Sequence, residues 1–172
     1  RDYVNIMDKN NWGLFGIYSL IMWALVLIII PGIVYLLGIL GVRMSKTNIS
    51  VREVFFGYAG ALIPLGLHLW IAFVIPMLFV NVTFIIQSIS DPFGWGWDFF
   101  HTANIPWHQF MPQYIPWLQA FSVLTGVYFS LRNIRNKWMS FRKNSFQVFL
   151  MCFPIILFVM VIAIGMLLFF TN

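Results

Sequence analysis

The chain alternates long uncharged apolar runs with short charged stretches. Four runs contain no Asp, Glu, Lys or Arg, namely residues 10–42, 54–90, 99–131 and 144–172. A bilayer core of ~30 Å needs about 20 apolar helical residues, and each run exceeds that length. The runs are continuous and do not alternate with polar residues, which favours helices over a β-barrel. We therefore predict four transmembrane helices near 14–41, 54–88, 114–132 and 146–170.

The second run is longer than a bilayer requires. A helix over this run would be about 50 Å long at 1.5 Å per residue. We expect it to tilt, to project beyond the membrane, or to break at Pro64 or Pro76.

The third run fits a membrane-spanning helix least well of the four, because three prolines lie near its start, at Pro106, Pro112 and Pro116. The stretch 92–113 therefore reads as an ordered surface segment or a short interfacial helix, and not as a span.

Composition places the chain in one broad class. Of 172 residues, 61% are hydrophobic and 9% charged, against about 45–50% and about 25% in soluble domains. The mean hydropathy is +0.87. These values exclude a soluble domain, a disordered tail and a nucleic-acid-binding module. The expected fold is an all-α integral membrane domain covering residues 1–172.

The basic residues suggest an orientation. Arg43, Lys46 and Arg52 lie between the first two predicted helices, and five more Lys or Arg lie between the last two. The segment between the middle helices carries only Asp91 and Asp98 as formal charges. The positive-inside rule then places loops 43–53 and 132–145 in the cytoplasm. Segment 90–113 and both termini would face the opposite side.

The first residue is Arg1 and not methionine, and no signal-peptide pattern follows it. We expect more chain before residue 1.

His68 is the one Asp, Glu, Lys, Arg or His side chain well inside a predicted span. Polar groups at membrane depth are costly and suggest function. His68 could be an axial haem ligand, with the second histidine supplied by a partner chain, or it could contact a quinone. It could also be a neutral histidine bonded to a backbone carbonyl or to a hydroxyl of a neighbouring helix.

The outer segment holds a possible metal site formed by His101, His108 and Met111. Imidazole and thioether together favour copper, and Asp91 and Asp98 could add oxygen ligands. The alternative is an interfacial segment whose histidines lie at the level of the lipid headgroups.

The stretch 90–100 is rich in turn formers and aromatic residues. Asp91-Pro92 favours a turn, and glycines at 94 and 96 permit positive φ. The tryptophans of this region suit a membrane–water boundary. The sharper interpretation is a platform that seats a partner protein or shields a cofactor from water. The residues that would form it are Asp91, Trp95, Trp97, Asp98 and Trp107.

Other chemical signals are few. No Gly-rich phosphate loop, zinc-protease motif or nucleophile elbow occurs. One cysteine, Cys152, cannot build a disulfide framework or a cysteine-ligated cluster. We therefore expect a non-catalytic subunit of an enzyme complex rather than a complete enzyme.

Three phrases carry a family resemblance. The chain reads Trp-Gly-Leu-Phe-Gly-Ile-Tyr-Ser from residue 12, Ile-Pro-Leu-Gly-Leu-His-Leu-Trp-Ile-Ala-Phe over 63–73, and Ser-Asp-Pro-Phe-Gly-Trp-Gly-Trp-Asp over 90–98. Over residues 12–131 the sequence resembles the C-terminal membrane region of bacterial membrane-bound polyferredoxin-type proteins. This group includes the membrane ferredoxins that accompany nitrate reductases.

The resemblance implies electron transfer at the bacterial inner membrane, alongside a quinone pool and multihaem cytochromes. The family's Cys-rich cluster motifs are absent, and Cys152 matches none of them. Any iron–sulfur cluster would therefore lie before Arg1 or in a partner subunit.

These observations give three hypotheses. The first is a membrane subunit or domain of a redox complex, which anchors extrinsic redox partners and contacts quinone or haem near His68. The second is a cofactor-free structural subunit that stabilises a larger membrane enzyme. The third is a copper-handling membrane protein that uses His101, His108 and Met111. The expected partners are the lipid bilayer and other membrane and extrinsic redox subunits, without nucleic acid.

Overall fold

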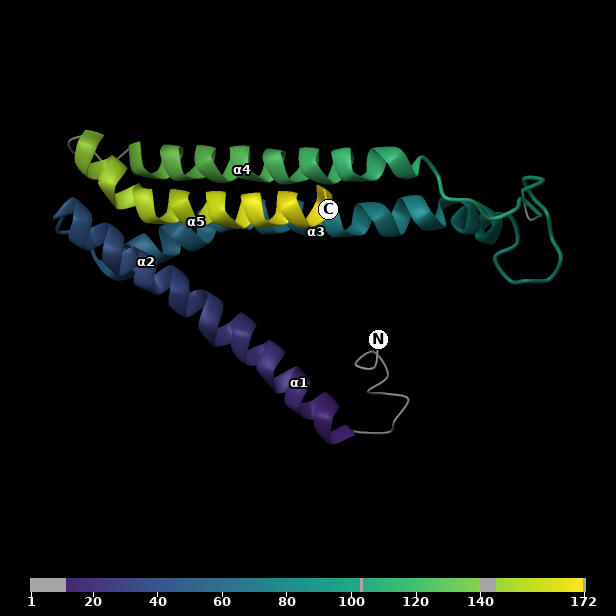
Figure 1. Cartoon of the computed structure of the whole chain (residues 1–172), viewed down its shortest axis with the longest axis horizontal. Helices are drawn as coiled ribbons and strands as arrows, with labels where there is room; N and C mark the ends of the chain where they lie inside the picture. Colours follow the sequence, from purple (N-terminus) through teal and green to yellow (C-terminus); the bar gives the residue numbers. More distant parts are fainter. Residues whose placement is uncertain (1–11, 103, 140–144, 172) are drawn as a thin grey trace. The chain divides into compact units, whose positions relative to one another are not determined.

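The computed structural model describes residues 12–102, 104–139 and 145–171 (Figure 1). Over these residues the secondary structure is helical and contains no strand, which confirms the all-α prediction. The helices are α1 Trp12–Ala24, the π-helical turn η1 Leu25–Ile29, α2 Ile30–Ser45, α3 Val51–Ser90, the 3-10 turn η2 Pro112–Tyr114, α4 Ile115–Met139 and α5 Ser145–Thr171.

Three helical stretches among the described residues are long and apolar enough to cross a membrane. They are Trp12–Ser45, which joins α1, η1 and α2, then Val51–Ser90 and Ser145–Phe170. The helix α4 is not one of them. Its last two turns carry Arg132, Arg135 and Lys137, which lower its hydropathy. The described residues thus contain four long helical segments, and α4 as a fourth span stays a prediction.

The C-terminal end of α4 differs from expectation. The helix continues to Met139, so Arg132, Arg135 and Lys137 lie on helical turns and not in the expected loop 132–145. No proline or glycine interrupts residues 127–139, and arginine and lysine are good helix formers. The first charged residue therefore shows where the helix becomes polar, but the helix continues beyond it.

The helix α3 runs unbroken for 40 residues, with Pro64 and Pro76 inside it. Its first turn is held by Ser50, whose Oγ accepts a hydrogen bond from the Glu53 backbone N–H at 3.2 Å. Of the three expected ways to accommodate its length, breakage at a proline does not occur.

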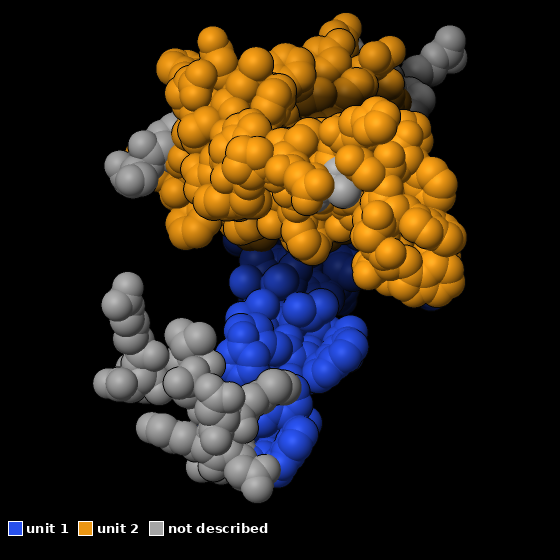
Figure 2. Space-filling model, turned by 90° about the vertical axis from the view of Figure 1, so that its right-hand side faces the viewer, with its two compact units in different colours: residues 1–59, 142–155 blue, residues 60–141, 156–172 orange. Residues whose placement is uncertain are grey.

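Residue contacts divide the chain into two compact units, coloured separately in Figure 2. Unit 1 comprises residues 1–59 and 142–155, and unit 2 comprises 60–141 and 156–172. The single domain over 1–172 stays a prediction.

The core of unit 1 forms around Gly41, a buried residue of α2. A Cβ on Gly41 would lie 2.6 Å from the carbonyl oxygen of Met151 and would also meet the Tyr58 hydroxyl. That hydroxyl donates a hydrogen bond to the same Met151 carbonyl. The missing side chain therefore lets α2 approach α3 and α5 closely, as small residues do between membrane helices.

The core of unit 2 lies where α3, α4 and α5 run side by side (Figure 1). Ala72, Val123 and Ala163, one from each helix, are buried together. Larger apolar side chains surround them, namely Leu69, Val127, Met166, Leu167 and Phe170. Small residues at the centre allow close backbone approach, and larger ones fill the margin.

Candidate functional site

His68 lies on α3 among the residues that pack in unit 2, and its side chain is half-buried. Its Nδ1 lies 2.8 Å from the carbonyl oxygen of Pro64, one turn earlier. A carbonyl oxygen only accepts hydrogen bonds, so Nδ1 carries the proton and donates it. In the neutral ring the lone pair then lies on Nε2. The geometry makes Nε2 a hydrogen-bond acceptor or a metal ligand.

The helix α4 packs directly against the backbone at His68. The Ser122 Oγ donates a hydrogen bond to the His68 carbonyl oxygen at 2.8 Å, and Gln119 Nε2 donates to the Ala72 carbonyl at 3.0 Å. The Phe129 ring lies 5.8 Å from the imidazole, centre to centre, at an interplanar angle of 32°. These contacts fix the histidine between two helices.

Gly126 makes this approach possible. A Cβ at Gly126 would lie 2.7 Å from the His68 Cβ and 3.3 Å from the Leu65 Cα. Both are atoms at or next to the backbone, so neither can move without shifting a helix.

We expect Gly126→Ala to lower stability by about 1–3 kcal/mol, because it overpacks this contact. Gly66→Ala is the matched control, since a Cβ there meets nothing within 4 Å. Thermal unfolding of the purified chain in detergent measures both. Equal unfolding temperatures for the two variants would contradict the packing at Gly126.

A second candidate region is the arm, defined here as residues 80–111. It comprises the end of α3 from Val80 to Ser90 and the segment that returns from it to α4. The returning segment is held to α3 by backbone and side-chain hydrogen bonds. Phe110 N–H donates to the Phe79 carbonyl at 3.2 Å, Trp107 Nε1 donates to the Val80 carbonyl at 3.2 Å, and Gln87 donates to the Ile105 carbonyl. The described residues of this segment before η2 form turns without an α-helix, so the alternative of a short interfacial helix does not occur among them.

Asp91 and Asp98 build the tip of the arm. The Asp91 carboxylate accepts hydrogen bonds from the backbone N–H groups of Trp95 and Gly96, both at 2.9 Å. This turn needs φ of +67° and +79° at Gly94 and Gly96, which glycine adopts without strain. The turn predicted from Asp91-Pro92 and the two glycines is thus present.

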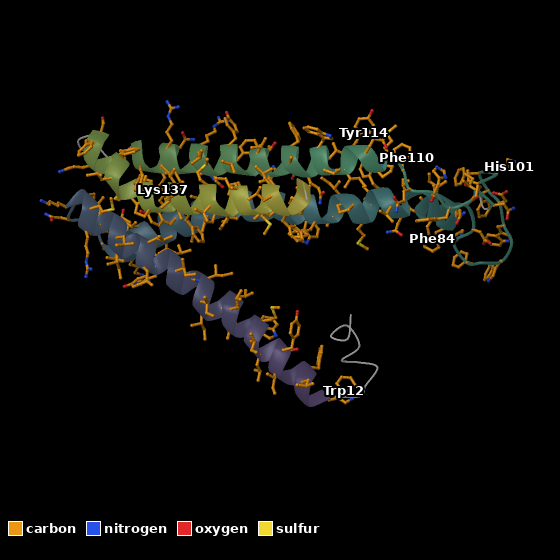
Figure 3. The ribbon with its side chains drawn as sticks, viewed as in Figure 1. Trp12, Phe84, His101, Phe110, Tyr114 and Lys137 are labelled. Carbon is orange, nitrogen blue, oxygen red and sulfur yellow. The ribbon has the colours of Figure 1, made fainter. Side chains whose placement is uncertain are left out.

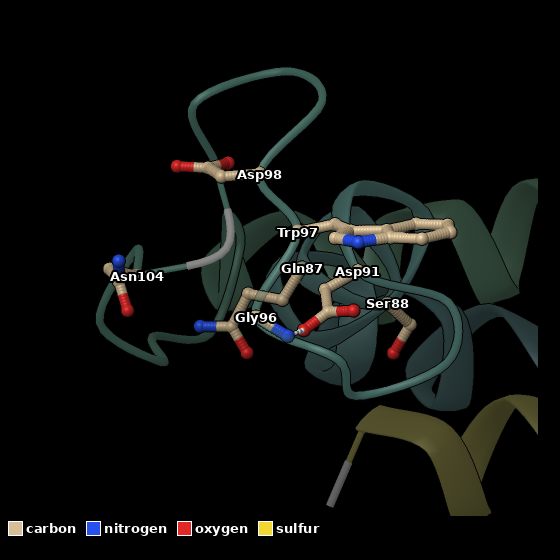
Figure 4. Close-up of a pocket in the computed structure, with 7 residues that line it drawn as sticks. All are labelled: Gln87, Ser88, Asp91, Gly96, Trp97, Asp98 and Asn104. Atoms are coloured by element: carbon tan, nitrogen blue, oxygen red, sulfur yellow. Dashed lines mark hydrogen bonds between the residues drawn. The ribbon is translucent and has the colours of Figure 1, made fainter.

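The Asp98 carboxylate closes the loop on the buried end of α3. Its Oδ1 accepts hydrogen bonds from the Ser90 Oγ and the Thr102 N–H, both at 2.8 Å. Both aspartates also line a polar pocket of about 290 Å³ (Figure 4). Gln87, Ser88, Gly96, Trp97 and Asn104 complete its lining. The carboxylates are engaged in holding the loop, so their first role is structural.

Two of the proposed copper residues, His101 and His108, each make a local contact within the arm. His101 is exposed at the tip, with Nδ1 3.9 Å from an Asp98 carboxylate oxygen. Figure 3 shows His101 at the far end of the arm from Phe110. The Nδ1 of His108 lies 3.1 Å from the Pro106 carbonyl oxygen. Among the described residues, no group of three His, Cys, Asp or Glu side chains is arranged to hold a metal.

Aromatic rings form a continuous exposed row at the tip. Phe93 stacks on Trp95 with ring centres 4.9 Å apart. Trp95 meets Trp97 at 4.9 Å, and Trp97 meets Phe99 at 5.2 Å. All four rings are exposed, and Trp107 is also exposed further along the segment. Four of the five expected platform residues, Asp91, Trp95, Trp97 and Asp98, therefore gather at the tip, while Trp107 lies along α3.

Sequence reasoning found His68 and the aromatic segment but missed the residues that position them. The Pro64 carbonyl and Gly126 act through geometry, which composition does not reveal. The spacing of Pro64 and His68, four residues apart in one helix, was the available signal for the Nδ1 bond. The functional assignment rests on these contacts, and no protein-family model, curated protein or solved structure matches the chain.

Proposed function

We propose that this chain is a membrane subunit or membrane domain of an electron-transfer complex, and that His68 contacts a membrane-soluble quinol. The observation that carries the proposal is the orientation of the His68 ring. Nδ1 is engaged by the Pro64 carbonyl at 2.8 Å, so Nε2 presents a lone pair inside a helix that can span the bilayer.

The direction of this hydrogen bond favours quinol over quinone. A quinone carbonyl accepts hydrogen bonds and therefore needs a donor. Nε2 carries no proton in the neutral ring and cannot donate one. A quinol hydroxyl donates, and Nε2 accepts. The same nitrogen can then receive one hydroxyl proton as the quinol is oxidised, while the second proton leaves to water and the two electrons pass to iron centres of the complex.

A second candidate is an axial haem ligand. An imidazole that donates Nδ1–H to a backbone carbonyl is oriented and made more basic for a metal on Nε2. Unit 2 supplies His68 from α3, and a second axial ligand would come from a partner chain.

The length of α4 supports a helix that crosses the bilayer. From Ile115 to Arg135, α4 measures about 30 Å at 1.5 Å per residue, which equals the hydrocarbon thickness. Figure 3 shows Tyr114 and Lys137 near its two ends. We propose α4 as the fourth span, with the basic ends cytoplasmic and the arm on the opposite side of a bacterial inner membrane.

The experiment that tests the function uses the gently purified native assembly. Iron and copper are measured per mole of chain, and a short-chain quinol is added while optical spectra are recorded. We expect stoichiometric iron that the quinol reduces. Iron that quinol leaves oxidised would overturn the quinol contact. An assembly without iron or copper would favour the structural subunit, and copper without iron would favour the outer histidines.

A further inference from the structure

We infer that the arm is a docking surface for an extrinsic protein that presents an apolar centre and a basic rim. The inference deepens the anchoring role and rests on the proposed membrane placement of α4. It follows from the length of α3, from the exposed apolar side chains of the arm, and from its charge.

The arm extends beyond its neighbouring helices. Gln119 reaches the Ala72 carbonyl, and α4 begins one turn before Gln119, at Ile115. On α5, the Phe170 ring lies 5.2 Å from the Phe73 ring, and the helix ends at Thr171. Past Phe79, α3 is therefore accompanied by the returning segment and not by α4 or α5.

This length carries the tip out of the bilayer. If Ile115 marks the hydrocarbon boundary, that boundary lies about one turn past Ala72 on α3. The stretch Val80–Ser90, about 15 Å long at 1.5 Å per residue, then lies beyond it. The headgroup region of one leaflet is about 5–8 Å thick. The aromatic tip then lies beyond the lipid headgroups, where an interfacial aromatic belt would not reach.

The exposed surface of the arm is nonetheless apolar. Phe84 and Ile89 on α3 are 60% and 58% exposed, and Phe93, Trp95 and Phe99 at the tip are 64%, 66% and 61% exposed. Large exposed apolar patches outside lipid mark protein interaction sites. Aromatic side chains are also enriched at the centres of protein interfaces.

A shallow apolar notch lies within this patch. It has a volume of about 250 Å³ and is lined by Ile86, Ile89, Phe100 and Thr102. The Thr102 hydroxyl donates one long hydrogen bond there, at 3.5 Å to the Ile86 carbonyl oxygen. The notch is large enough for an apolar side chain of a partner, the arrangement typical of interface anchors.

Charge distinguishes a protein from a lipid surface. The arm contains no Lys or Arg, and its formal charges are Asp91 and Asp98. Anionic lipids attract basic segments and repel acidic ones. A negative, apolar surface is therefore complementary to a basic protein rim and not to a bacterial lipid surface.

The test measures which environment covers the tip. In a Cys152→Ala background, Phe93→Cys is labelled with a large hydrophilic maleimide. Labelling is compared in phosphatidylcholine–phosphatidylglycerol nanodiscs holding the chain alone, in native membranes, and in native membranes washed with urea to remove extrinsic proteins. Phe121→Cys on α4, where Phe121 is 70% exposed, is the matched control.

We expect Phe93→Cys to react in nanodiscs, to be protected in native membranes, and to react again after the wash. Phe121→Cys should stay unreactive throughout, because lipid covers it. Phe99→Cys provides a second position at the tip if Phe93→Cys impairs assembly. Two results would overturn the inference, namely a tip that is unreactive in nanodiscs, or one that reacts equally before and after the wash. Neither result depends on quinol or iron, so the docking surface can fail while the proposed function stands.

Discussion

Replacing His68 with leucine is expected to slow quinol-dependent reduction of the native assembly by about tenfold or more. The leucine removes the Nε2 acceptor, and a net hydrogen-bond contribution of about 1–1.5 kcal/mol corresponds to roughly tenfold in rate. Leucine also leaves the helix intact, since it is a good helix former of similar size. The rate of absorbance change after addition of a short-chain quinol measures the effect.

The control for this variant is His108→Gln. His108 is exposed on the arm, and its Nδ1 lies 3.1 Å from the Pro106 carbonyl oxygen, so it resembles His68 in its local bond but not in its depth. We expect His108→Gln to keep the quinol-dependent rate. Iron content separates the two roles of His68: unchanged iron in His68→Leu supports the quinol contact, whereas iron lost with its optical spectrum supports a haem ligand. Full quinol-dependent turnover in His68→Leu would rule out both roles.

Replacing Gly41 with valine is expected to prevent unit 1 from packing. The Cβ alone would lie 2.6 Å from the Met151 carbonyl oxygen and would collide with the Tyr58 hydroxyl. Valine adds two methyl groups to that Cβ, and the Met151 carbonyl is backbone, so relief requires helix movement. We expect a loss of about 3 kcal/mol or more, at the upper end of overpacking costs.

The unfolding temperature in detergent and the yield of folded chain measure this loss. Gly16→Val is the matched control, because a Cβ at Gly16 meets nothing within 4 Å. Both variants introduce a β-branched residue into an apolar helix, so they share the same intrinsic helix propensity cost. If Gly41→Val and Gly16→Val unfolded at the same temperature, the close contact at Gly41 would be refuted.

The uncharged runs were enough to predict the helices. The predicted helices 54–88 and 146–170 lie within one to three residues of the ends of α3 and α5, because apolar continuity is a strong signal at this length. The end of α4 was wrong by seven residues, since Arg132 was read as the start of a loop and the helix runs to Met139. Charge indicates where a helix enters a polar region and does not indicate where its hydrogen bonding stops.

The two proposed sites differ in how far the sequence could define them. The Asp-Pro turn and the glycines predicted the bend at the tip, because these residues act locally. The row of stacked rings joins residues close in the chain, but it follows from the exact course of the backbone at the tip, which composition does not reveal. The hold of the returning segment on α3 depends on residues far apart in the chain, such as Trp107 and Val80. The sequence leaves three roles open for His68, namely haem ligand, quinone contact and structural histidine. The Pro64 carbonyl contact is compatible with each of them, because it engages only Nδ1.

The unbroken course of α3 has a consequence for electron flow. His68 and Ser90 lie on one continuous helix, which separates them by about 33 Å along its length at 1.5 Å per residue. Tunnelling rates fall exponentially with distance. If a quinol is oxidised at His68 as proposed, its electrons would therefore not reach a centre beyond the arm in one productive step. A redox complex assembled on this chain therefore needs an intermediate carrier along that path, or an acceptor that approaches His68 from the basic ends of the helices. In such a complex the arm would hold the partner in place. The spacing of the cofactors, and not the position of the arm, would determine the path of electron transfer.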